Sequence, residues 1–346
     1  MAAVSHIERQ FRLRINQNLD MSARIGILST AHMHSYGYAH AVNTHREAAL
    51  VGVWDDDADR GMKFADRFST GFEPNMETLL EQCDGVIITS ENKRHAEMVE
   101  LAASAGKQIL CEKPLVTTEQ EAARMKEAVD KHGVKLMTAF PCRYSPAFVR
   151  LKQRVSSGEI GNVLSICATN HGMCPFDWFV DVDKSGGGAM TDHVVHVADL
   201  IRDLLGSEPV EVYAQTGNGM YAQEWEDVAM LHVKFSDEVF ATIDSSWSRP
   251  KSYKTWGDVT MNVVGEKGVI GMDMFGQTID VYQNESARHW LAGYGSDMDA
   301  GLVADFVNVI SDGAEPRITF EDGLAATKVF VAGYRSAEMG QPVAVA

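Results

Sequence analysis

The chain has 346 residues, of which 45% are hydrophobic and 23% charged, and its formal net charge at pH 7 is -17. This length fits two domains with a core each, and no apolar run approaches the roughly 18 residues of a membrane span, so we expect a soluble globular protein and exclude a membrane protein. The negative charge repels nucleic acid and anionic lipid, which leaves small-molecule chemistry as the expected activity.

The cysteines and the N-terminal segment bear on the cellular compartment. Five cysteines are scattered along the chain without a C-x-x-C pair, which argues against a disulfide framework or a structural zinc site and predicts a reducing cytoplasm. The first 20 residues lack the apolar core and the cleavage site of a secretory signal. We expect residues 1–22 to form a flexible arm without a functional role.

Short apolar runs and helical patterns alternate from Arg24 to about Phe140. The apolar runs are RIGIL, ALVGVW, GVIIT, KQILC and KLMTAF. Strands that alternate with helices of about 10 to 15 residues are typical of parallel βαβ units in a doubly wound sheet. We therefore predict an α/β N-terminal domain over residues 23–142.

The stretch ARIGILSTAHMHSYGYAH, residues 23–40, begins like a dinucleotide-binding strand, turn and helix, but it lacks the glycines. Where the G-x-G-x-x-G fingerprint has its glycines, this chain has Ser29, Ala31 and His34. Backbone N–H groups and the helix dipole hold the anion in such a site, so glycine is not required at every position. We predict that Ser29, Thr30 and Ala31 still bind a nicotinamide cofactor.

Two histidines and one aspartate extend this candidate cofactor site. His32 and His34 fit two interpretations: they donate to phosphate oxygens or face the ribose, or they are packed or solvated polar residues. Asp55 ends the run VGVWD, 26 residues after Ser29, where a carboxylate accepts hydrogen bonds from ribose hydroxyls. The acidic run from Asp55 to Asp57 repels a 2′-phosphate, which favours NAD over NADP, and it also suits the first turn of a helix.

Antiparallel strands are predicted after Pro141. We expect a helix over residues 146–156, a strand over 163–170 and a helix after the glycines at 186–188. The segments PVEVYAQT, DVAMLHVKF, VFATIDSSW, DVTMNVVG and TIDVYQN then alternate apolar with polar residues, as strands with one solvated or partner-covered face do. Residues 143–346 are thus predicted to form an α+β domain with an open, mostly antiparallel sheet, whose free face is a candidate contact for a homodimer or homotetramer.

Two helices are expected to close the chain, near residues 299–311 and 321–336. The C-terminal helix could pack back on the first domain. No internal repeat or low-complexity tract interrupts this organisation.

Several motifs together resemble one known family. The segment HAEMVELAASAGKQILCEKPLVTT places Glu112-Lys113-Pro114 after a strand, and GVIITSENKRHAE, GGGAMTDHVVH, VVGEKGVIGMD and DGLAATKVFVAGYRSAEMGQPV extend the match over nearly the whole chain. This set resembles the Gfo/Idh/MocA oxidoreductases, the glucose-fructose oxidoreductase and inositol dehydrogenase family. The resemblance implies an NAD-binding Rossmann domain over residues 23–142 and a substrate-binding, oligomerising domain over 143–346.

The resemblance also implies cofactor contacts beyond the first loop. The implied residues are Ser90, Asn92, His95 and Glu112, together with Lys113. For His95, an ordinary polar residue in the first turn of a helix is an equally good interpretation.

Lys113 has a role that can be derived from its place in the fold. In an open α/β sheet, ligands lie beyond the carboxyl ends of the strands, where this lysine is expected, and the proline stiffens its loop. An ammonium there can hydrogen-bond a substrate hydroxyl and stabilise the alkoxide that precedes hydride loss, the more so if burial lowers its pKa.

Asp192 and His196 are four residues apart on the helix that follows the glycine run, so they share one face. In the resembled family the pattern reads D-x-G-x-H, with the histidine as acid/base and the aspartate contacting substrate hydroxyls or orienting the histidine. Here Val194 replaces the glycine. Our hypothesis is that His196 accepts the hydroxyl proton and Lys113 shares that hydrogen bond, the alternative being a core histidine on an apolar helix.

Three further residues are candidates for the substrate side. His193 completes a D-H-x-x-H cluster that invites a zinc site, but hydride chemistry needs no metal and we assign no metal ligand. Arg143 matches a family position close to substrate and could bind a hydroxyl or an anionic group. Trp178 could form an apolar wall against a sugar ring, and interdomain packing is an equally good interpretation for both.

These residues predict an NAD-dependent dehydrogenase that acts on a secondary hydroxyl of a sugar, sugar derivative or cyclitol. A first alternative uses the same residues for a redox-neutral glycosidase or lyase, which oxidises, eliminates and then reduces. A second alternative is a non-catalytic, NAD-bound regulator, for which the unusual S-T-A-H-M-H loop is the best support.

Overall fold

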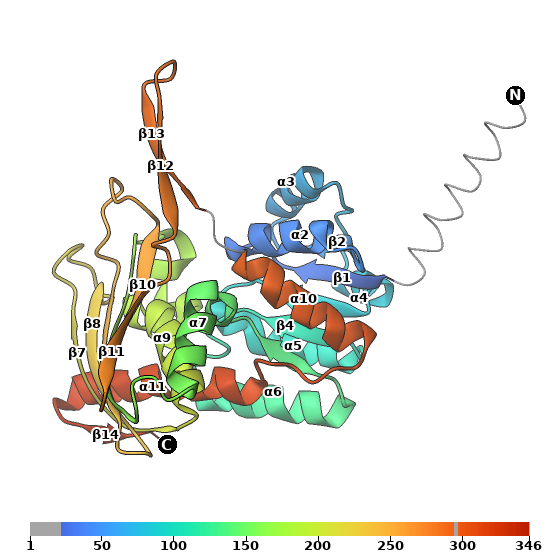
Figure 1. Cartoon of the computed structure of the whole chain (residues 1–346). Helices are drawn as coiled ribbons and strands as arrows, with labels where there is room; N and C mark the ends of the chain where they lie inside the picture. Colours follow the sequence, from blue (N-terminus) through green and yellow to red (C-terminus); the bar gives the residue numbers. More distant parts are fainter. Residues whose placement is uncertain (1–21, 294–296, 346) are drawn as a thin grey trace, which may run out of the picture.

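The computed structural model describes residues 22–293 and 297–345. Apart from Ser22, the predicted arm lies outside the described residues. Two β-sheets stand side by side, and the chain passes between them more than once (Figure 1).

The first sheet is parallel and five-stranded, in the order β2-β1-β3-β4-β5. Its strands are β1 (Ala23–Leu28), β2 (Ala48–Trp54), β3 (Gly85–Ile88), β4 (Gln108–Cys111) and β5 (Leu136–Thr138). All residues of β3 and β5 are buried, as continuous apolar runs predict for a sheet covered on both faces. The predicted doubly wound α/β fold is therefore confirmed.

Helices cover both faces of this sheet. They are α2 (His34–Thr44), α3 (Ala58–Phe68), α4 (Met76–Gln82), α5 (His95–Ser104), α6 (Glu119–His132) and α10 (Met298–Ser311). A Cβ on Gly26 of β1 would meet Leu79 of α4, whereas one on Gly85 of β3 would meet Phe306 of α10. Because paired strands keep their pleat in register, α4 and α10 lie on opposite faces.

The second sheet has seven strands in the order β11-β10-β6-β9-β8-β7-β14, and only β6 and β9 run parallel. The strands are β6 (Val163–Gly172), β7 (Pro209–Gly217), β8 (Val228–Phe235), β9 (Phe240–Ser246), β10 (Gly257–Gly265), β11 (Gly268–Asp273) and β14 (Val343–Ala344). The predicted α+β organisation with a mostly antiparallel sheet is confirmed.

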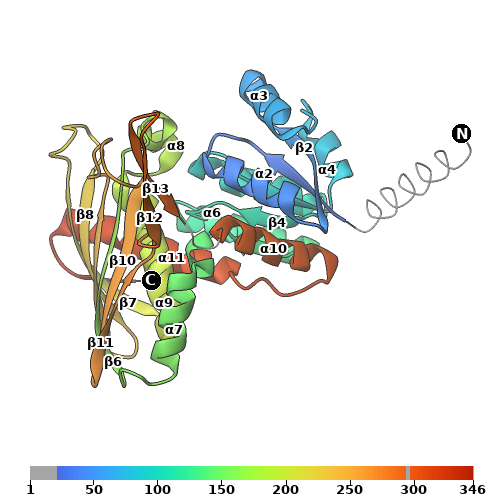
Figure 2. The ribbon, with the colours of Figure 1, turned by 45° about the horizontal axis from the view of Figure 1, so that its top comes forward.

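Three helices pack against the second sheet. They are α7 (Pro146–Ser156), α9 (Ala189–Leu205) and α11 (Phe320–Met339), and α7 and α9 lie toward the first sheet (Figure 2). Helix α11 also touches β5 and α6, and Thr138 Oγ1 donates to the carbonyl oxygen of Thr319 at 2.9 Å. The closing helices therefore tie the two sheets together.

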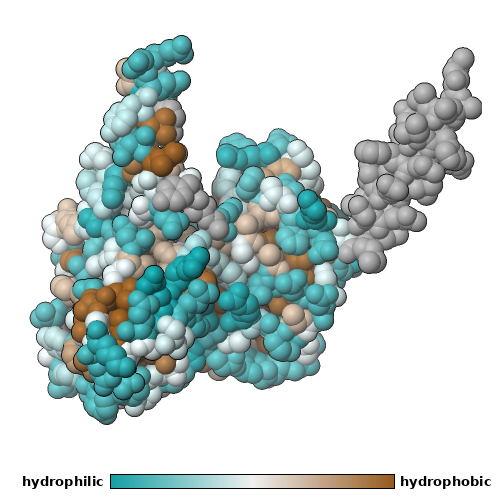
Figure 3. Space-filling view, in the orientation of Figure 1, coloured by the Kyte–Doolittle hydropathy of each residue, from teal (hydrophilic) through white to brown (hydrophobic). Residues whose placement is uncertain are grey.

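One predicted strand has a different neighbour from the one expected. The segment TIDVYQN was expected in the open sheet, but β12 (Thr278–Gln283) pairs only with β13 (Arg288–Gly293) in a hairpin that stands away from the body (Figure 1). Alternation of apolar and polar residues sets the two faces of a strand but not its partner. Ile279 is 56% exposed, and apolar surface is visible on the hairpin (Figure 3).

Within the described parts of the chain, no helix combines the length and the apolar character that a membrane crossing requires.

We predict that Phe306→Ala lowers the free energy of unfolding by about 3–5 kcal/mol, because Phe306 is fully buried between α10 and the first sheet and its loss leaves a cavity. Chemical denaturation of the purified protein measures the change. Asn308→Ala, on the exposed side of the same helix, is the control and should change stability by less than about 1 kcal/mol. Equal effects of both variants would show that α10 is not part of this core.

Candidate active site

The loop between β1 and α2 has the bend that the fingerprint glycines usually provide. Ser29 adopts φ 66°, in the left-handed region that favours glycine, and its N–H donates to the carbonyl oxygen of Trp54 at 2.7 Å. Helix α2 begins at His34, and its N-cap residue Met33 makes no side-chain cap. The N–H groups of the first turn already have partners: that of His34 donates to His32 Nδ1 at 3.1 Å, and those of Ser35 and Tyr36 donate to backbone carbonyl oxygens. The positive end of the α2 dipole still faces the carboxyl end of β1, beside the switch point between β1 and β3, where it would stabilise an anion.

Asp55 ends β2 as predicted, but its oxygens already accept hydrogen bonds from the protein. Thr30 donates to Oδ2 through N (2.7 Å) and Oγ1 (2.5 Å), and Arg60 donates to both oxygens at 3.0 and 2.6 Å. Burial alone raises the pKa of Asp55, but these donors outweigh it and the net pKa is lowered. Asp55 therefore holds the β1–α2 loop in place, and a ribose hydroxyl has to share this carboxylate with Arg60.

The acidic run after β2 is partly neutralised. Asp56 pairs with Arg60 at 2.9 Å and with Arg94 at 2.7 Å. The sequence argument that this run repels a 2′-phosphate did not include these two arginines, which come from α3 and from η1 (Asn92–Arg94).

The three candidate cofactor residues after β3 are buried. His95 lies with Nδ1 at 3.0 Å from the carbonyl oxygen of Pro114 and Nε2 at 3.3 Å from that of Ser90, so it fixes the loop that carries Lys113. Asn92 Nδ2 donates to the carbonyl oxygen of Ser185 in the second domain at 2.8 Å, and its Oδ1 has no partner among the described residues.

Glu112 is a fully buried carboxylate. Its Oε1 accepts from the Tyr38 hydroxyl and lies 2.8 Å from His34 Nδ1, while its Oε2 accepts from the N–H of Lys113 at 2.7 Å. Burial alone raises the pKa of Glu112, but the neighbouring His34, His32 and Lys113 lower it overall. Ligand atoms of His32, His34 and Glu112 lie within 4.8 Å of one another, but the carboxylate oxygens already accept hydrogen bonds.

His32 leaves one ring nitrogen without a partner. Its Nδ1 accepts from the N–H of His34 at 3.1 Å, and the ring packs against Phe179 with centroids 5.2 Å apart. Burial lowers the pKa of His32 well below its usual value, so the ring is neutral with its proton on Nε2. This N–H is buried and finds no acceptor among the described residues.

The candidate catalytic residues meet at a cavity of about 300 Å³ between the two domains, which we call the interdomain cavity. Groups from the β1–α2 loop, the loop after β4, β6, α9, β10 and α10 contribute to its wall. The lining residues are His32, Met33, His34, Lys113, Pro141, Cys142, Asn170, His171, Pro175, Phe179, Asp192, His193, His196, Trp256, Gly257, Asp258, Val259, Phe275, Met298 and Asp299.

Lys113 is an ammonium ion held by Asp192. Lys113 Nζ lies 2.7 Å from Asp192 Oδ1, and Asp192 Oδ2 accepts from Trp247 Nε1 at 3.0 Å. Burial alone lowers the pKa of Lys113, but Asp192 and Glu112 outweigh it and the net pKa is raised. This corrects the expectation that burial lowers the lysine pKa: the buried carboxylates stabilise its charged form.

His196 lies on the same side of α9 as Asp192 and lines the same cavity as Lys113. Its Nδ1 is 3.8 Å from Cys142 Sγ. Burial and the Lys113 charge lower the pKa of His196 well below its usual value, and burial raises the pKa of Cys142 to about 12. The imidazole is therefore neutral at pH 7 and able to accept a proton, and the thiol stays protonated.

The remaining histidine of the D-H-x-x-H cluster points toward protein groups. His193 Nδ1 lies 3.1 Å from the carbonyl oxygen of Asn170, and Nε2 lies 3.2 Å from Asp192 Oδ2. Both ring nitrogens thus have partners, and the arrangement orients Asp192 toward Lys113.

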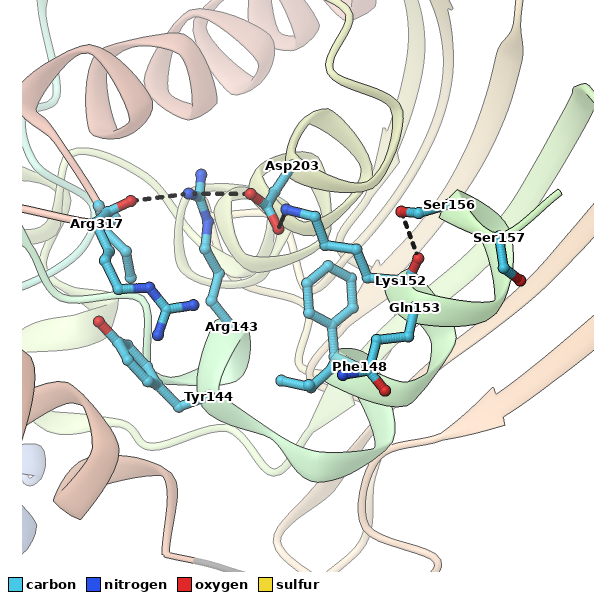
Figure 4. A pocket seen from close by; sticks show the side chains of 11 residues that line it. Arg143, Tyr144, Phe148, Lys152, Gln153, Ser156, Ser157, Asp203 and Arg317 are labelled. Carbon is cyan, nitrogen blue, oxygen red and sulfur yellow. Dashed lines mark hydrogen bonds and ion pairs between the residues drawn. The ribbon is translucent and has the colours of Figure 1, made fainter.

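Arg143 lies outside the interdomain cavity, which differs from the substrate contact but agrees with the packing interpretation that the sequence also allowed. It lines a different pocket of about 610 Å³ with Tyr144, Lys152 and Asp203 (Figure 4). Its guanidinium donates to both oxygens of Asp199, at 2.8 and 2.5 Å, and is buried. The carboxylates of α9 and α11 attract this arginine inward, so it is not free for a substrate.

Trp178 also lies away from the cavity wall. It is buried in η3 (Asp177–Val180), stacks on Phe179 with centroids 3.9 Å apart, and donates from Nε1 to the carbonyl oxygen of Ala31 at 3.1 Å. The neighbouring Phe179 lines the cavity instead. Trp178 thus contacts the β1–α2 loop, which matches the packing interpretation.

Sequence reasoning missed several polar residues of this region, namely Tyr38, Arg60, Asn170, Trp247 and Asp299. Tyr38 lies four residues after His34, so helical spacing could have linked it to that loop. Arg60 lies four residues after Asp56, so the same spacing could have linked it to the acidic run. Asn170, Trp247 and Asp299 come from distant elements, and no spacing rule predicts their positions.

Comparisons with known proteins agree with this architecture. Residues 23–140 match the NAD-binding Rossmann fold of the GFO/IDH/MocA oxidoreductase family, and residues 148–271 match the C-terminal domain of that family. The uncharacterized oxidoreductase YrbE of Bacillus subtilis (strain 168) is 30% identical over 272 residues, which cover 76% of this chain and 78% of that protein.

Two further relatives match nearly the whole chain. Inositol 2-dehydrogenase of Rhizobium meliloti (strain 1021) is 27% identical over 94% of this chain and 100% of its own length. The crystal structure of GenD2 from gentamicin A biosynthesis in complex with NAD superposes with a TM-score of 0.85 and 26% identity, covering 93% of this chain and 96% of GenD2.

We predict that Arg143→Met lowers the free energy of unfolding by about 3–5 kcal/mol at pH 8, because it leaves the buried carboxylate of Asp199 without its cation, whereas Asp322 keeps Arg202. Burial raises the pKa of Asp199 to about 7 even beside Arg143. A carboxyl group whose pKa is higher in the folded than in the unfolded state destabilises the folded state more as the pH rises. The loss of unfolding free energy in Arg143→Met should therefore be smaller at pH 5 than at pH 8.

Urea denaturation at several pH values measures this deficit. Arg154→Met is the control, because Arg154 is exposed and its ion pair with Glu159 lies at the surface. A variant at Arg143 that kept its stability but lost affinity for substrate would restore the role expected from the sequence.

Proposed function

The chain belongs to the Gfo/Idh/MocA family of oxidoreductases, and on that premise we propose that it is an NAD-dependent dehydrogenase acting on a secondary hydroxyl of a sugar, sugar derivative or cyclitol. The observation that carries the proposal is the convergence of Lys113, Asp192 and His196 on one cavity between the domains.

The residues present fit the cofactor. Ser29 supplies the left-handed bend, the positive dipole end of α2 faces the β1–α2 loop, and His32 Nε2–H is a buried donor without an acceptor among the described residues. A dinucleotide held along the β1–α2 loop and the exits of β2 and β3 would place its nicotinamide toward Lys113. NAD supplies the hydride acceptor there, and NADP is the less expected cofactor.

Two side chains of the cavity, those of Lys113 and His196, have different roles toward the substrate hydroxyl. Lys113, held as a cation by Asp192, donates a hydrogen bond to the substrate oxygen and stabilises negative charge that develops on it. With its proton on Nδ1, which faces Cys142 Sγ, His196 has Nε2 left to accept the proton of the hydroxyl. Burial around these groups excludes water and strengthens both interactions.

We predict that Lys113→Ala and His196→Ala each lower kcat/KM for polyol oxidation by at least about 100-fold, since each removes a group that acts in the transition state. The appearance of reduced nicotinamide measures the rate. The rise in melting temperature with NAD should persist in His196→Ala, because this variant leaves the β1–α2 loop intact. Lys131→Ala, on the exposed end of α6, serves as the control.

Two outcomes would contradict this function. Cleavage of a glycoside without net formation of NADH would favour the redox-neutral alternative. An increase in melting temperature with NAD, combined with no turnover of any sugar or cyclitol in either assay, would favour the non-catalytic regulator.

We also propose that the chain forms a homodimer or homotetramer through the free face of the second sheet. Met230 of β8 and Phe240 of β9 are 54% and 47% exposed there, and they belong to strands whose other faces are buried. A second copy would cover them.

The variant Met230→Glu, alone and with Phe240→Glu, should shift the protein toward the monomer. Each substitution places a carboxylate in the proposed interface, opposite either the same carboxylate of the second copy or an apolar surface. Light scattering after size-exclusion chromatography measures the mass. Met220→Glu, an exposed methionine outside the sheet, is the control. A wild-type protein that is monomeric at micromolar concentration would refute the proposed assembly.

A further inference from the structure

The charges around the interdomain cavity point to a narrower substrate class. We propose that the cavity takes a polyol that carries an amino group, an amino sugar or aminocyclitol, and that the carboxylate of Asp299 receives its ammonium. This inference rests on the proposed dehydrogenase function and concerns the same site.

Among the described residues, Asp299 is the carboxylate of the cavity wall for which no ion pair or side-chain donor is found. It lies in the first turn of α10, and its carboxylate packs directly on Gly37 of α2, where a Cβ would overlap it. Within residues 22–293 and 297–345, no side chain donates a hydrogen bond to it or forms an ion pair with it. Its Oδ atoms are therefore free to accept from a ligand.

The other carboxylates of the wall already have cationic partners. Asp192 pairs with Lys113 at 2.7 Å. Asp258 pairs with Arg249 and lies 3.0 Å from His171 Nδ1. A ligand ammonium thus finds one accessible carboxylate in this cavity, that of Asp299.

An anionic ligand would find no comparable partner. The charge of Lys113 is balanced by Asp192, although its ammonium keeps a donor for a hydroxyl, and His171 lies between Asp258 and Asp244, 3.2 Å from the latter. His34, which lines the cavity and whose charge acts to lower the pKa of Asp299, lies with Nδ1 2.8 Å from the buried carboxylate of Glu112. His32 and His196 are neutral, because burial lowers the pKa of each. A carboxylate or phosphate entering the cavity would lose its hydration without gaining a free cation, which is costly.

The helix end does not need Asp299. Asp297 already caps α10, since its Oδ1 accepts from the N–H groups of Asp299 and Ala300 at 2.9 and 3.3 Å. Burial raises the pKa of Asp299 to about 6, so the environment disfavours an isolated carboxylate there. A bound ammonium relieves that cost, and the apolar side chains of Phe179, Phe275 and Met298 leave room for the face of a ring.

The test compares matched substrates that differ in one group: D-glucose, 6-amino-6-deoxy-D-glucose and D-glucuronate, and likewise scyllo-inositol and scyllo-inosamine. We measure kcat/KM with NAD, and affinity for the protein–NAD complex by calorimetry. The amine is expected to exceed the neutral analogue by about tenfold in kcat/KM or affinity, and D-glucuronate to rank last, because one charge-assisted hydrogen bond is gained.

Asp299→Asn removes the negative charge and keeps the shape of the side chain. We expect it to lower the preference for the amine, measured as the ratio of kcat/KM or affinity for the amine to that for its neutral analogue, by about tenfold. Asp297→Ser is the matched control, because serine still caps α10 and the ratio should stay as in the wild type.

Different results would contradict the preference for an amino group and the dehydrogenase function. If D-glucuronate binds best, or if Asp299→Asn leaves the ratio unchanged, the charge preference is overturned even when turnover occurs. If no compound is oxidised but the protein–NAD complex binds scyllo-inosamine more tightly than scyllo-inositol, the inference holds and the dehydrogenase function falls. Binding of none of these compounds overturns the inference.

Discussion

The ion pair between Lys113 and Asp192 joins the two halves of this molecule. Lys113 follows β4 of the first sheet, Asp192 lies in the first turn of α9 beneath the second sheet, and their charged atoms meet at 2.7 Å in a buried setting. Such a pair adds little net stability, because removing both charges from water costs about as much as their attraction returns. The ion pair instead fixes the position of the Lys113 ammonium between the domains.

Other contacts support that position from both sides. His95 fixes the backbone after Lys113, Glu112 accepts from the N–H of Lys113, and Trp247 and His193 orient Asp192. The segment between β6 and α9 adds two links to the first domain, from Trp178 to Ala31 and from Ser185 to Asn92. A displacement of the β1–α2 loop would therefore disturb its hydrogen bond to the second domain.

Sequence reasoning located the parts of this site that depend on local rules. The parallel strands followed from alternating apolar runs, Lys113 from its place after a strand, and Asp192 with His196 from helical spacing. For Arg143 and Trp178 it left substrate contact and interdomain packing open, because their positions depend on carboxylates and loops far along the chain, and the contacts of both match packing. Asp299 was missed for the same reason: α10 returns to the cavity only after strands β6 to β13, and no short sequence motif predicts that return.

The return of α10 has a consequence for how the protein is made. The last strand of the first sheet ends at Thr138, yet the face of that sheet beneath Phe306 stays uncovered until residues 298–311 have been synthesised. Because the ribosome adds ~5–20 residues per second, that apolar face remains exposed for several seconds or longer before α10 is synthesised. A fragment ending at residue 142 would keep the same bare face permanently, and chaperone binding or aggregation is its natural fate.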